Sequence, residues 1–337
     1  MDELPFYRGR VQARAKLNLT LQVFGRRTDG MHELRSVMTT LALADLITVE
    51  FSFVENPDGK SSPRSDTCPG SRLWRVESNV KSVPGGEGNL CYRAAEMFFE
   101  YAGVDPGSVQ LAVWIDKHIP EAAGLGGGSA DAAAILRFLY AGLQEGILDR
   151  PGEVLPRMTC LQLEQIALRC GADVPFCLYG GVRLCGGVGE IMTPLPKLSP
   201  VSVLLAVPPH AVQTKEAFRM LDQRRSSGFG SETGAERPMR QEPWRKAISR
   251  QSLKAIAPLV QNDFTSVISE SHGQTASLLE ALRATSASVV SMSGSGPSCF
   301  ALFADRKDCE ESLAAIRPAF SGVRFFITEI DSTADTI

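Results

Sequence analysis

Apolar and polar residues alternate near the start of the chain. Over residues 17–23, a leucine or valine occupies every second position, with polar residues between them. This spacing predicts a half-buried β-strand, because successive side chains of a strand point to opposite faces. Lys16 would then lie on the polar face together with Asn18. The same pattern predicts strands over residues 47–53 and 110–115.

A helical period begins after a glycine-rich run. Over residues 129–140 the apolar residues recur at positions i, i+3, i+4 and i+7, which predicts an amphipathic helix. These positions are Ala132, Ile135, Leu136 and Leu139. The glycine run should therefore lead directly into the N-terminus of this helix.

A second helix is predicted over residues 163–170, where the same spacing returns. Its apolar positions are Leu163, Ile166, Ala167 and Cys170. Gly171 suits the C-terminal cap of this helix, and Pro175 prevents the helix from continuing.

The pattern changes near residue 197, after which strands and helices mix. The predicted elements are strands at 201–207, 288–292, 299–303 and 323–330, a helix opened by Thr214, a further helix before 288, and a helix at 309–320. Residues 55–72 and 222–241 are polar and aperiodic, so we expect a surface excursion and a mobile loop. Together with the chain length, this predicts an α+β fold of two lobes, residues 1–196 and 197–337.

Composition narrows the function classes. The 337 residues carry a formal net charge of -3, whereas nucleic-acid binders usually have a basic excess, so we expect no nucleic-acid partner. The first twenty residues are rich in charge, which argues against a secretory signal. No apolar run approaches the roughly 20 residues that span a bilayer, so we expect no membrane contact and a cytoplasmic location.

Cysteine and histidine usage argues against a zinc site. The eight cysteines form no CxxC pair, and the four histidines are scattered along the chain. Zinc sites need clustered ligands. We therefore expect reduced cysteines that are buried as small hydrophobic residues.

The glycine run at residues 124–129 (GLGGGS) is the first candidate for chemistry. Backbone N–H groups at a helix N-terminus receive phosphate well, and glycine lets the ligand approach closely. No lysine follows the last glycine, so this is no P-loop, and the spacing is not that of a dinucleotide-binding turn. A tight connection would also use glycines, so on this segment alone both interpretations stay open.

Six segments, one of which includes the glycine run, occur in the order found in a known family. The segments are residues 15–19 (AKLNL), 25–34 (GRRTDGMHEL), 117–120 (KHIP) with the glycine run, 171–175 (GADVP), 187–190 (GVGE) and 293–297 (SGSGP). Along nearly the whole chain, the sequence resembles the GHMP kinases, which include galactokinase, homoserine kinase, mevalonate kinase and phosphomevalonate kinase. It resembles in particular the branch that acts on 4-diphosphocytidyl-2-C-methyl-D-erythritol in the non-mevalonate isoprenoid route.

The resemblance implies a two-lobed kinase with its active site in the cleft between the lobes. It would use ATP and Mg²⁺ to phosphorylate a hydroxyl of that small-molecule substrate. By family position Asp173 is the base that takes the hydroxyl proton, and Lys16 is its partner. Taken alone, Asp173 could be a turn residue and Lys16 a solvated strand residue.

The resemblance also implies a set of substrate contacts. His32 would recognise the cytosine edge, since a neutral imidazole both donates and accepts a hydrogen bond. Phe218 would stack on the base, although its place beside Ala217 and Leu221 also suits a core residue. The remaining implied substrate contacts are Asn18, Val188 and Thr214. Met31 stands where relatives have tyrosine, which predicts a looser cytidine site.

For ATP, the implied phosphate ligands belong to the glycine run. They are Gly124, Gly126, Gly127, Gly128 and Ser129. Asn89 and Lys117 would border the adenine, although Asn89 also suits a turn. We expect Asp131 to compensate the helix dipole in the first turn rather than to bind magnesium. Residues 293–298 should close on the substrate phosphates or on the glycine run.

Two rival functions remain at this stage. One is another GHMP kinase that acts on homoserine, mevalonate or a sugar, against which the Gly30–Glu33 segment (GMHE) speaks. The other is a silent nucleotide-binding paralogue, which would have no use for a proton acceptor. We expect a monomer or a weak homodimer.

Overall fold

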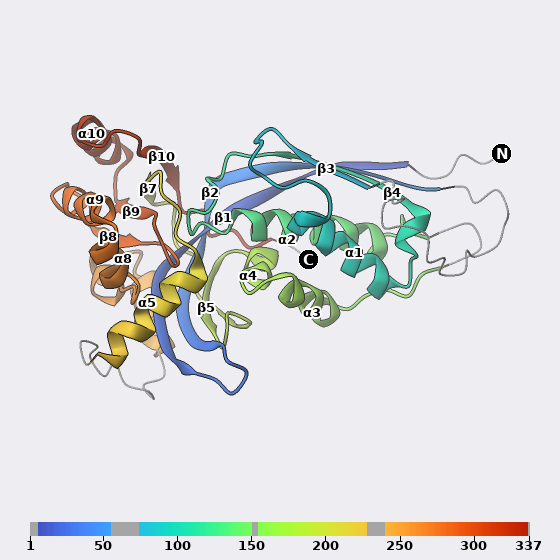
Figure 1. Cartoon of the computed structure of the whole chain (residues 1–337), viewed down its shortest axis with the longest axis horizontal. Helices are drawn as coiled ribbons and strands as arrows, with labels where there is room; N and C mark the ends of the chain where they lie inside the picture. Colours follow the sequence, from blue (N-terminus) through green and yellow to red (C-terminus); the bar gives the residue numbers. More distant parts are fainter. Residues whose placement is uncertain (1–5, 55–73, 150–153, 228–239, 336–337) are drawn as a thin grey trace.

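The computed structural model describes residues 6–54, 74–149, 154–227 and 240–335. Two sheets organise these residues, each with helices packed on it (Figure 1). The predicted excursion at 55–72 and most of the predicted loop at 222–241 lie outside the described residues. The α+β class with two lobes is confirmed.

The first lobe contains a six-stranded sheet in the order β3-β4-β2-β5-β6, with β1 paired to β2. Its strands are β1 (Phe6–Arg26), β2 (His32–Phe53), β3 (Trp74–Ser78), β4 (Val109–Asp116), β5 (Val182–Gly186) and β6 (Ile191–Pro194). Its helices are η1 (Gly86–Gly88), α1 (Leu90–Ala102), η2 (Pro106–Ser108), α2 (Gly127–Gln144), α3 (Cys160–Cys170) and α4 (Val174–Tyr179). Figure 1 shows α1, α2 and α3 on one side of this sheet.

The second lobe contains a four-stranded antiparallel sheet in the order β10-β7-β9-β8. Its strands are β7 (Ser202–Val207), β8 (Val289–Met292), β9 (Cys299–Phe303) and β10 (Arg324–Glu329). Its helices are α5 (Thr214–Ser226), α6 (Gln241–Ser249), α7 (Leu253–Ile256), η3 (Ala257–Leu259), α8 (Thr265–Ser271), α9 (Gly273–Arg283), α10 (Arg306–Ile316) and η4 (Arg317–Ala319).

The β1–β2 hairpin belongs to the first sheet and also contacts the second lobe. The backbone N–H of Leu21 donates to the Gln261 carbonyl at 2.8 Å, and the N–H of Asp331 donates to the Thr40 carbonyl at 3.0 Å. Strands of 21 and 22 residues are needed to reach both lobes. The sequence pattern predicted only part of each strand.

The expectation of a half-buried strand over residues 17–23 is wrong, because β1 is buried on both faces from residue 15 to residue 21. Its polar face is covered by the second lobe. Thr20 donates its hydroxyl to the Gln261 carbonyl at 2.9 Å, and the N–H of Asn18 donates to the Ser293 hydroxyl at 3.3 Å. Polar residues on this face of β1 therefore do not indicate that the face is exposed to solvent.

The predicted end of the helix at 163–170 is confirmed, because α3 ends at Cys170 with Gly171 as its C-terminal cap. Pro175 lies in the first turn of the next helix, α4, where proline costs no hydrogen bond. One helix prediction needs correction. Residues 222–226 belong to α5 and not to a loop. The helices predicted at 129–140 and 163–170 are confirmed as α2 and α3.

The cysteines described by the structure are mostly buried among apolar side chains, as Cys91 and Cys299 are. Cys160 is exposed, against expectation, because it is the first residue of α3. In the described ranges, no helix combines the length and the apolar content needed to cross a membrane.

We predict that Phe99→Ala lowers the free energy of unfolding by about 3–5 kcal/mol, because it leaves a cavity in the core. Phe99 is fully buried, and its ring centre lies 5.7 Å from that of Trp74. Urea unfolding followed by circular dichroism measures the loss. Phe6→Ala is the control, since Phe6 is 64% exposed. Equal losses in the two variants would contradict the assignment of the core.

Candidate active site

A cavity of about 1230 Å³ lies between the two lobes and is lined by residues of both. Every site residue predicted from the sequence lines it. These are Lys16, Asn18, His32, Asn89, Lys117, Gly124, Gly126, Gly127, Gly128, Ser129, Asp173, Val188, Thr214 and Phe218. The structure thus brings the predicted set together, while the role of each residue stays a prediction.

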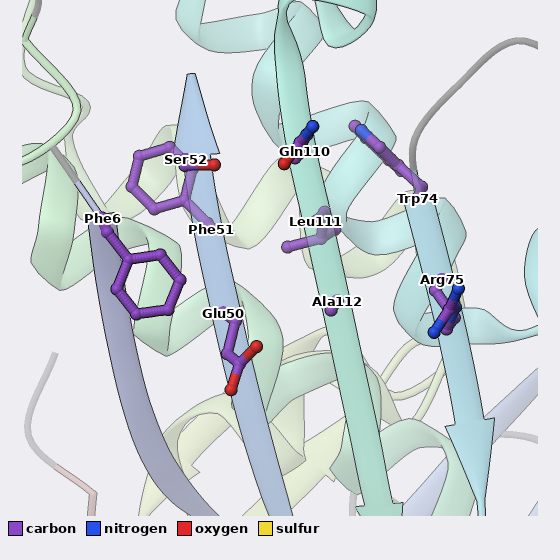
Figure 2. Close-up of a pocket in the computed structure, with 9 residues that line it drawn as sticks. All are labelled: Phe6, Glu50, Phe51, Ser52, Trp74, Arg75, Gln110, Leu111 and Ala112. Atoms are coloured by element: carbon purple, nitrogen blue, oxygen red, sulfur yellow. The ribbon is translucent and has the colours of Figure 1, made fainter. Parts of the chain in front are cut away.

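A second cavity of about 420 Å³ lies on β1, β2, β3 and β4 (Figure 2). Phe6, Glu50, Arg75 and Gln110 are among its lining residues, and the predicted site residues are not. It offers an open sheet surface and no convergent set of reactive groups. The cavity between the lobes is therefore the candidate active site.

The glycine loop, residues 124–129, has a backbone that only glycine adopts easily. Gly124 has a φ of 72° and Gly126, the residue before α2, has a φ of 69°. A Cβ on Gly124 would lie 2.5 Å from the Ser293 carbonyl oxygen, and a Cβ on Gly126 would lie 2.8 Å from Cγ of Lys16. The loop is held too closely by its neighbours for any side chain at these two positions.

Hydrogen bonds from both lobes hold the backbone carbonyl groups of this loop. The N–H of Lys16 in β1 donates to the Leu125 carbonyl at 2.9 Å. The hydroxyl of Ser293, between β8 and β9, donates to the Gly124 carbonyl at 3.1 Å. Residues 293–298 thus pack on the glycine loop, which is one of the two arrangements expected for them.

Lys16 and Asp173 form an ion pair in the cavity. Nζ of Lys16 lies 3.3 Å from Oδ2 of Asp173 and donates to Oδ1 of Asn18 at 2.7 Å. Lys16 is 4% exposed, so the picture of a solvated strand lysine is wrong. The side chain of Asp173 is 35% exposed, so it can meet a ligand.

Asp173 owes its place to α4, which the sequence pattern did not predict. It is the residue before the first turn of α4, and its side chain makes no capping bond to that helix among the described contacts. Asn18 is held in turn, because its Nδ2 donates to the Ser36 hydroxyl at 2.8 Å. The pair is therefore positioned by β1, β2 and the start of α4.

Lys117 lies in a buried cluster with two carboxylates. Its Nζ is 2.5 Å from Oδ2 of Asp45 and 2.9 Å from Oδ2 of Asp131. Asp45 also accepts the N–H groups of His118 and Ile119 at 2.5 and 2.8 Å. Burial alone lowers the pKa of Lys117, but the two carboxylates raise it above its ordinary value, so Lys117 stays charged.

The expectation that Asp131 is a dipole-compensating acid in the first helical turn is not met, because the residue lies beyond that turn. It is the fifth residue of α2 and is 3% exposed. Burial raises its pKa to about 7, an effect that Lys117 opposes. Its Oδ1 is buried without a hydrogen-bond partner among the described residues. The sequence pattern did not predict that Asp131 would join Lys117 and Asp45 in a buried cluster.

Asn89 is a helix cap, which favours the structural interpretation of this residue. Its Oδ1 accepts the N–H of Cys91 at 2.8 Å, and its Nδ2 donates to the Pro84 carbonyl at 2.8 Å. Both ends of the amide are thus engaged at the start of α1. Its contribution to the cavity is the wall beside the glycine loop.

At the other end of the cavity, His32 meets α5. The rings of His32 and Phe218 stack with centres 4.6 Å apart and planes at 18°. Nε2 of His32 lies 2.9 Å from Oδ1 of Asp222, and Nη2 of Arg26 lies 2.7 Å from Oδ2 of the same carboxylate. Phe218 thus stacks on a protein side chain here, and its edge-to-face contact with Phe264 also marks it as a packing residue.

Sequence reasoning missed Asp222 and Arg26, and placed Asp222 in a loop. The available signal was the i, i+4 spacing of Phe218 and Asp222, which puts both on one face of α5. Two other residues expected to contact the substrate have hydrogen-bond partners within the protein. Thr214 lies 3.1 Å from Ser295, hydroxyl to hydroxyl, and the N–H of Val188 donates to Glu190 at 2.6 Å.

Comparisons with known proteins decide the family. Residues 89–181 match the model of the GHMP kinases N terminal domain, and residues 244–320 match that of the GHMP kinases C terminal domain. The 4-diphosphocytidyl-2-C-methyl-D-erythritol kinase of Geobacillus kaustophilus is 35% identical over 95% of this chain and 94% of its own length. The chain belongs to the GHMP kinase family. It is accordingly an ATP-dependent small-molecule kinase.

Further relatives support the assignment of this chain to the GHMP kinase family. The 4-diphosphocytidyl-2-C-methyl-D-erythritol kinase of Alkaliphilus metalliredigens is 34% identical over 87% of both chains. A crystal structure of 4-(cytidine 5'-diphospho)-2C-methyl-D-erythritol kinase is 29% identical and superposes with a TM-score of 0.69 over 96% of this chain and all of the other. A homoserine kinase from Cytophaga hutchinsonii, 16% identical, superposes with a TM-score of 0.68 over 97% and 96% of the two chains and shows the fold alone.

We predict that Gly124→Ala weakens ATP binding at least about tenfold, a loss of about 1.4 kcal/mol. The new methyl group would meet the Ser293 carbonyl and would hold a φ of 72° that alanine disfavours. Calorimetric titration with ATP measures the effect. Gly273→Ala is the matched control, since a Cβ there meets nothing within 4 Å. Unchanged affinity in the Gly124 variant would show that the loop tolerates displacement.

We predict that Asp131→Asn makes the free energy of unfolding fall less as the pH rises. Because the pKa of Asp131 is raised to about 7 on folding, the folded protein keeps a proton that the unfolded chain has lost between about pH 4 and 7. Stability that depends on this proton is thus lost as the pH rises through that window.

The free energy of unfolding of this variant, relative to the unmodified protein, should therefore increase between pH 5 and pH 8. We expect at least about 1.4 kcal/mol, the equivalent of one pKa unit. Urea unfolding at both pH values measures it. A difference between the two proteins that does not change with pH would contradict a raised pKa.

Proposed function

We propose that this kinase transfers the γ-phosphoryl group of ATP to a hydroxyl of 4-diphosphocytidyl-2-C-methyl-D-erythritol. The relatives that carry this substrate in their names match the chain over nearly its full length. The observation that carries the proposal is the placement of the Lys16–Asp173 pair beside the glycine loop in one cavity.

The glycine loop suits the triphosphate end of ATP. Helix α2 begins at Gly127, and Ala130 is the residue whose N–H donates to the Gly126 carbonyl, at 2.8 Å. The earlier N–H groups of the helix are thus available to phosphate oxygens. The missing side chains at Gly124 and Gly126 let Ser293 and Lys16 lie directly against the loop.

The residues present fit a magnesium ion that is carried mainly by the nucleotide. The described residues hold no group of three or more histidine, cysteine or acidic side chains suited to a metal. Magnesium usually binds one or two carboxylates together with substrate phosphates. Ser129 and the unpartnered Oδ1 of Asp131 are the protein oxygens we assign to it. The bound ion would neutralise charge on the phosphates.

Asp173 would take the proton from the acceptor hydroxyl as that oxygen bonds to the γ-phosphorus and the bond to ADP breaks. One of its oxygens pairs with Lys16, and its partial exposure leaves the carboxylate open to the substrate. The Lys16 ammonium would offset the negative charge that develops in the transfer. Asn18 keeps that ammonium in place.

Two other functions are weaker. Homoserine and mevalonate kinases share the fold with this chain at 16% and 14% identity, which says nothing about the acceptor. A silent nucleotide binder would not need the Lys16–Asp173 pair. The expectations of a cytoplasmic location and of a monomer or weak homodimer still rest on the sequence.

We predict that Asp173→Asn lowers kcat by about 10²–10⁴-fold, the usual contribution of a general base. ATP affinity should change little, because the proposal assigns the phosphates of ATP to the glycine loop and not to Asp173. An ADP-release assay with the cytidine compound, homoserine and mevalonate measures turnover and substrate choice. Asp149→Asn is the control, since Asp149 pairs with Arg157 outside the cavity. Turnover by the Asp173 variant at the unmodified rate would eliminate this residue as the base.

A further inference from the structure

The carboxylate of Asp222 has two different partners. Oδ1 faces Nε2 of His32 at 2.9 Å, and Oδ2 receives Nη2 and Nε of Arg26 at 2.7 and 3.2 Å. Asp222 does not line the cavity, whereas His32 and Arg26 do. Any effect of Asp222 on a ligand in the cavity would therefore pass through His32 or Arg26.

The charge of Asp222 decides where His32 carries its proton. Burial tends to raise the pKa of Asp222, but the hydrogen bonds and charges of His32 and Arg26 hold it below its ordinary value. An ionised carboxylate only accepts hydrogen bonds. Nε2 of His32 must then carry hydrogen, and in the neutral ring Nδ1 is left with a lone pair.

The His32 ring has little freedom to turn over. It is 8% exposed and lies flat against Phe218, which is itself packed edge to face on Phe264 with ring centres 5.0 Å apart. A turn of the ring would exchange Nε2 for a carbon and break the contact with Asp222. The stack and the carboxylate thus hold one orientation and one tautomer.

We propose that Asp222, aligned by Arg26, is the positioning residue that makes this site select cytosine over uracil. Cytosine carries an amino donor at position 4, whereas uracil carries a carbonyl acceptor there. A lone pair on Nδ1 of His32 matches the first and repels the second. This inference rests on the proposed function and on the contact between His32 and the cytosine edge that the family resemblance implies.

Two substitutions separate positioning from simple structural support. Asp222→Ala removes the acceptor, so the His32 tautomer is no longer set and selectivity should fall. Asp222→Asn does something different. Arginine can only donate, so the amide oxygen should turn to Arg26 and the amide NH₂ to His32. That arrangement makes Nε2 the acceptor and puts the hydrogen on Nδ1.

The experiment compares kcat/KM for the cytidine substrate and its uridine analogue at pH 8.5, where ordinary imidazole groups are neutral. We expect the unmodified enzyme to prefer cytidine at least tenfold, the alanine variant to lose most of this ratio, and the asparagine variant to reverse it. The change should lie in KM, with KM for ATP unchanged. Glu270→Gln, which breaks the ion pair of α5 with α8 through Arg224, should keep the original ratio.

Nitrogen-15 NMR of His32 provides a readout that does not need turnover. The Nε2–H tautomer is expected in the unmodified protein and the Nδ1–H tautomer in the asparagine variant. If that variant keeps the cytidine preference, or if the unmodified protein shows Nδ1–H, the inference is overturned. If the unmodified enzyme ignores the cytidine compound altogether, the proposed function fails instead, and the NMR result still decides whether Asp222 sets the tautomer.

Discussion

The glycine loop is held by two hydrogen bonds to its own carbonyl groups, one from each lobe. Lys16 donates its backbone N–H to Leu125, and Ser293 donates its hydroxyl to Gly124. Four of its six residues are glycines and only Leu125 packs into the core, so these hydrogen bonds to the backbone help to set its position. The start of α2 is set with it. The lysine that holds the loop through its backbone also reaches Asp173 through its side chain.

Two buried lysines line the same cavity, and they differ in the exposure of the carboxylates that pair with them. Lys117 is enclosed by Asp45 and Asp131, and its charge is balanced inside the protein. Lys16 is just as buried, but its partner Asp173 is partly exposed. A buried charge is costly unless it is paired, so both lysines need their carboxylates. The Lys16 pair is the one whose carboxylate a substrate can reach.

The sequence predicted what depends on near neighbours and missed what depends on distant ones. The helix over 129–140 and the glycine loop before it follow from local spacing, and they are confirmed. The burial of Lys16 could not be predicted, since a polar strand face looks the same whether water or a second lobe covers it. Asp45 and Asp131 are 86 residues apart in the sequence and meet around Lys117. Asp222 was missed for another reason: the residues around it are polar, so the end of helix α5 was predicted as part of a loop.

The division of labour between the lobes explains how one fold can serve different acceptors. The glycine loop and the Lys16–Asp173 pair come from the first lobe, whereas Phe218 and Asp222 come from α5 of the second. A homoserine kinase shares this fold with a TM-score of 0.68 at only 16% identity. The arrangement of the sheets therefore does not by itself choose the acceptor. On our proposal, the side chains that hold His32 contribute to that choice in this chain, since a base is distinguished at its edge by the position of a single hydrogen.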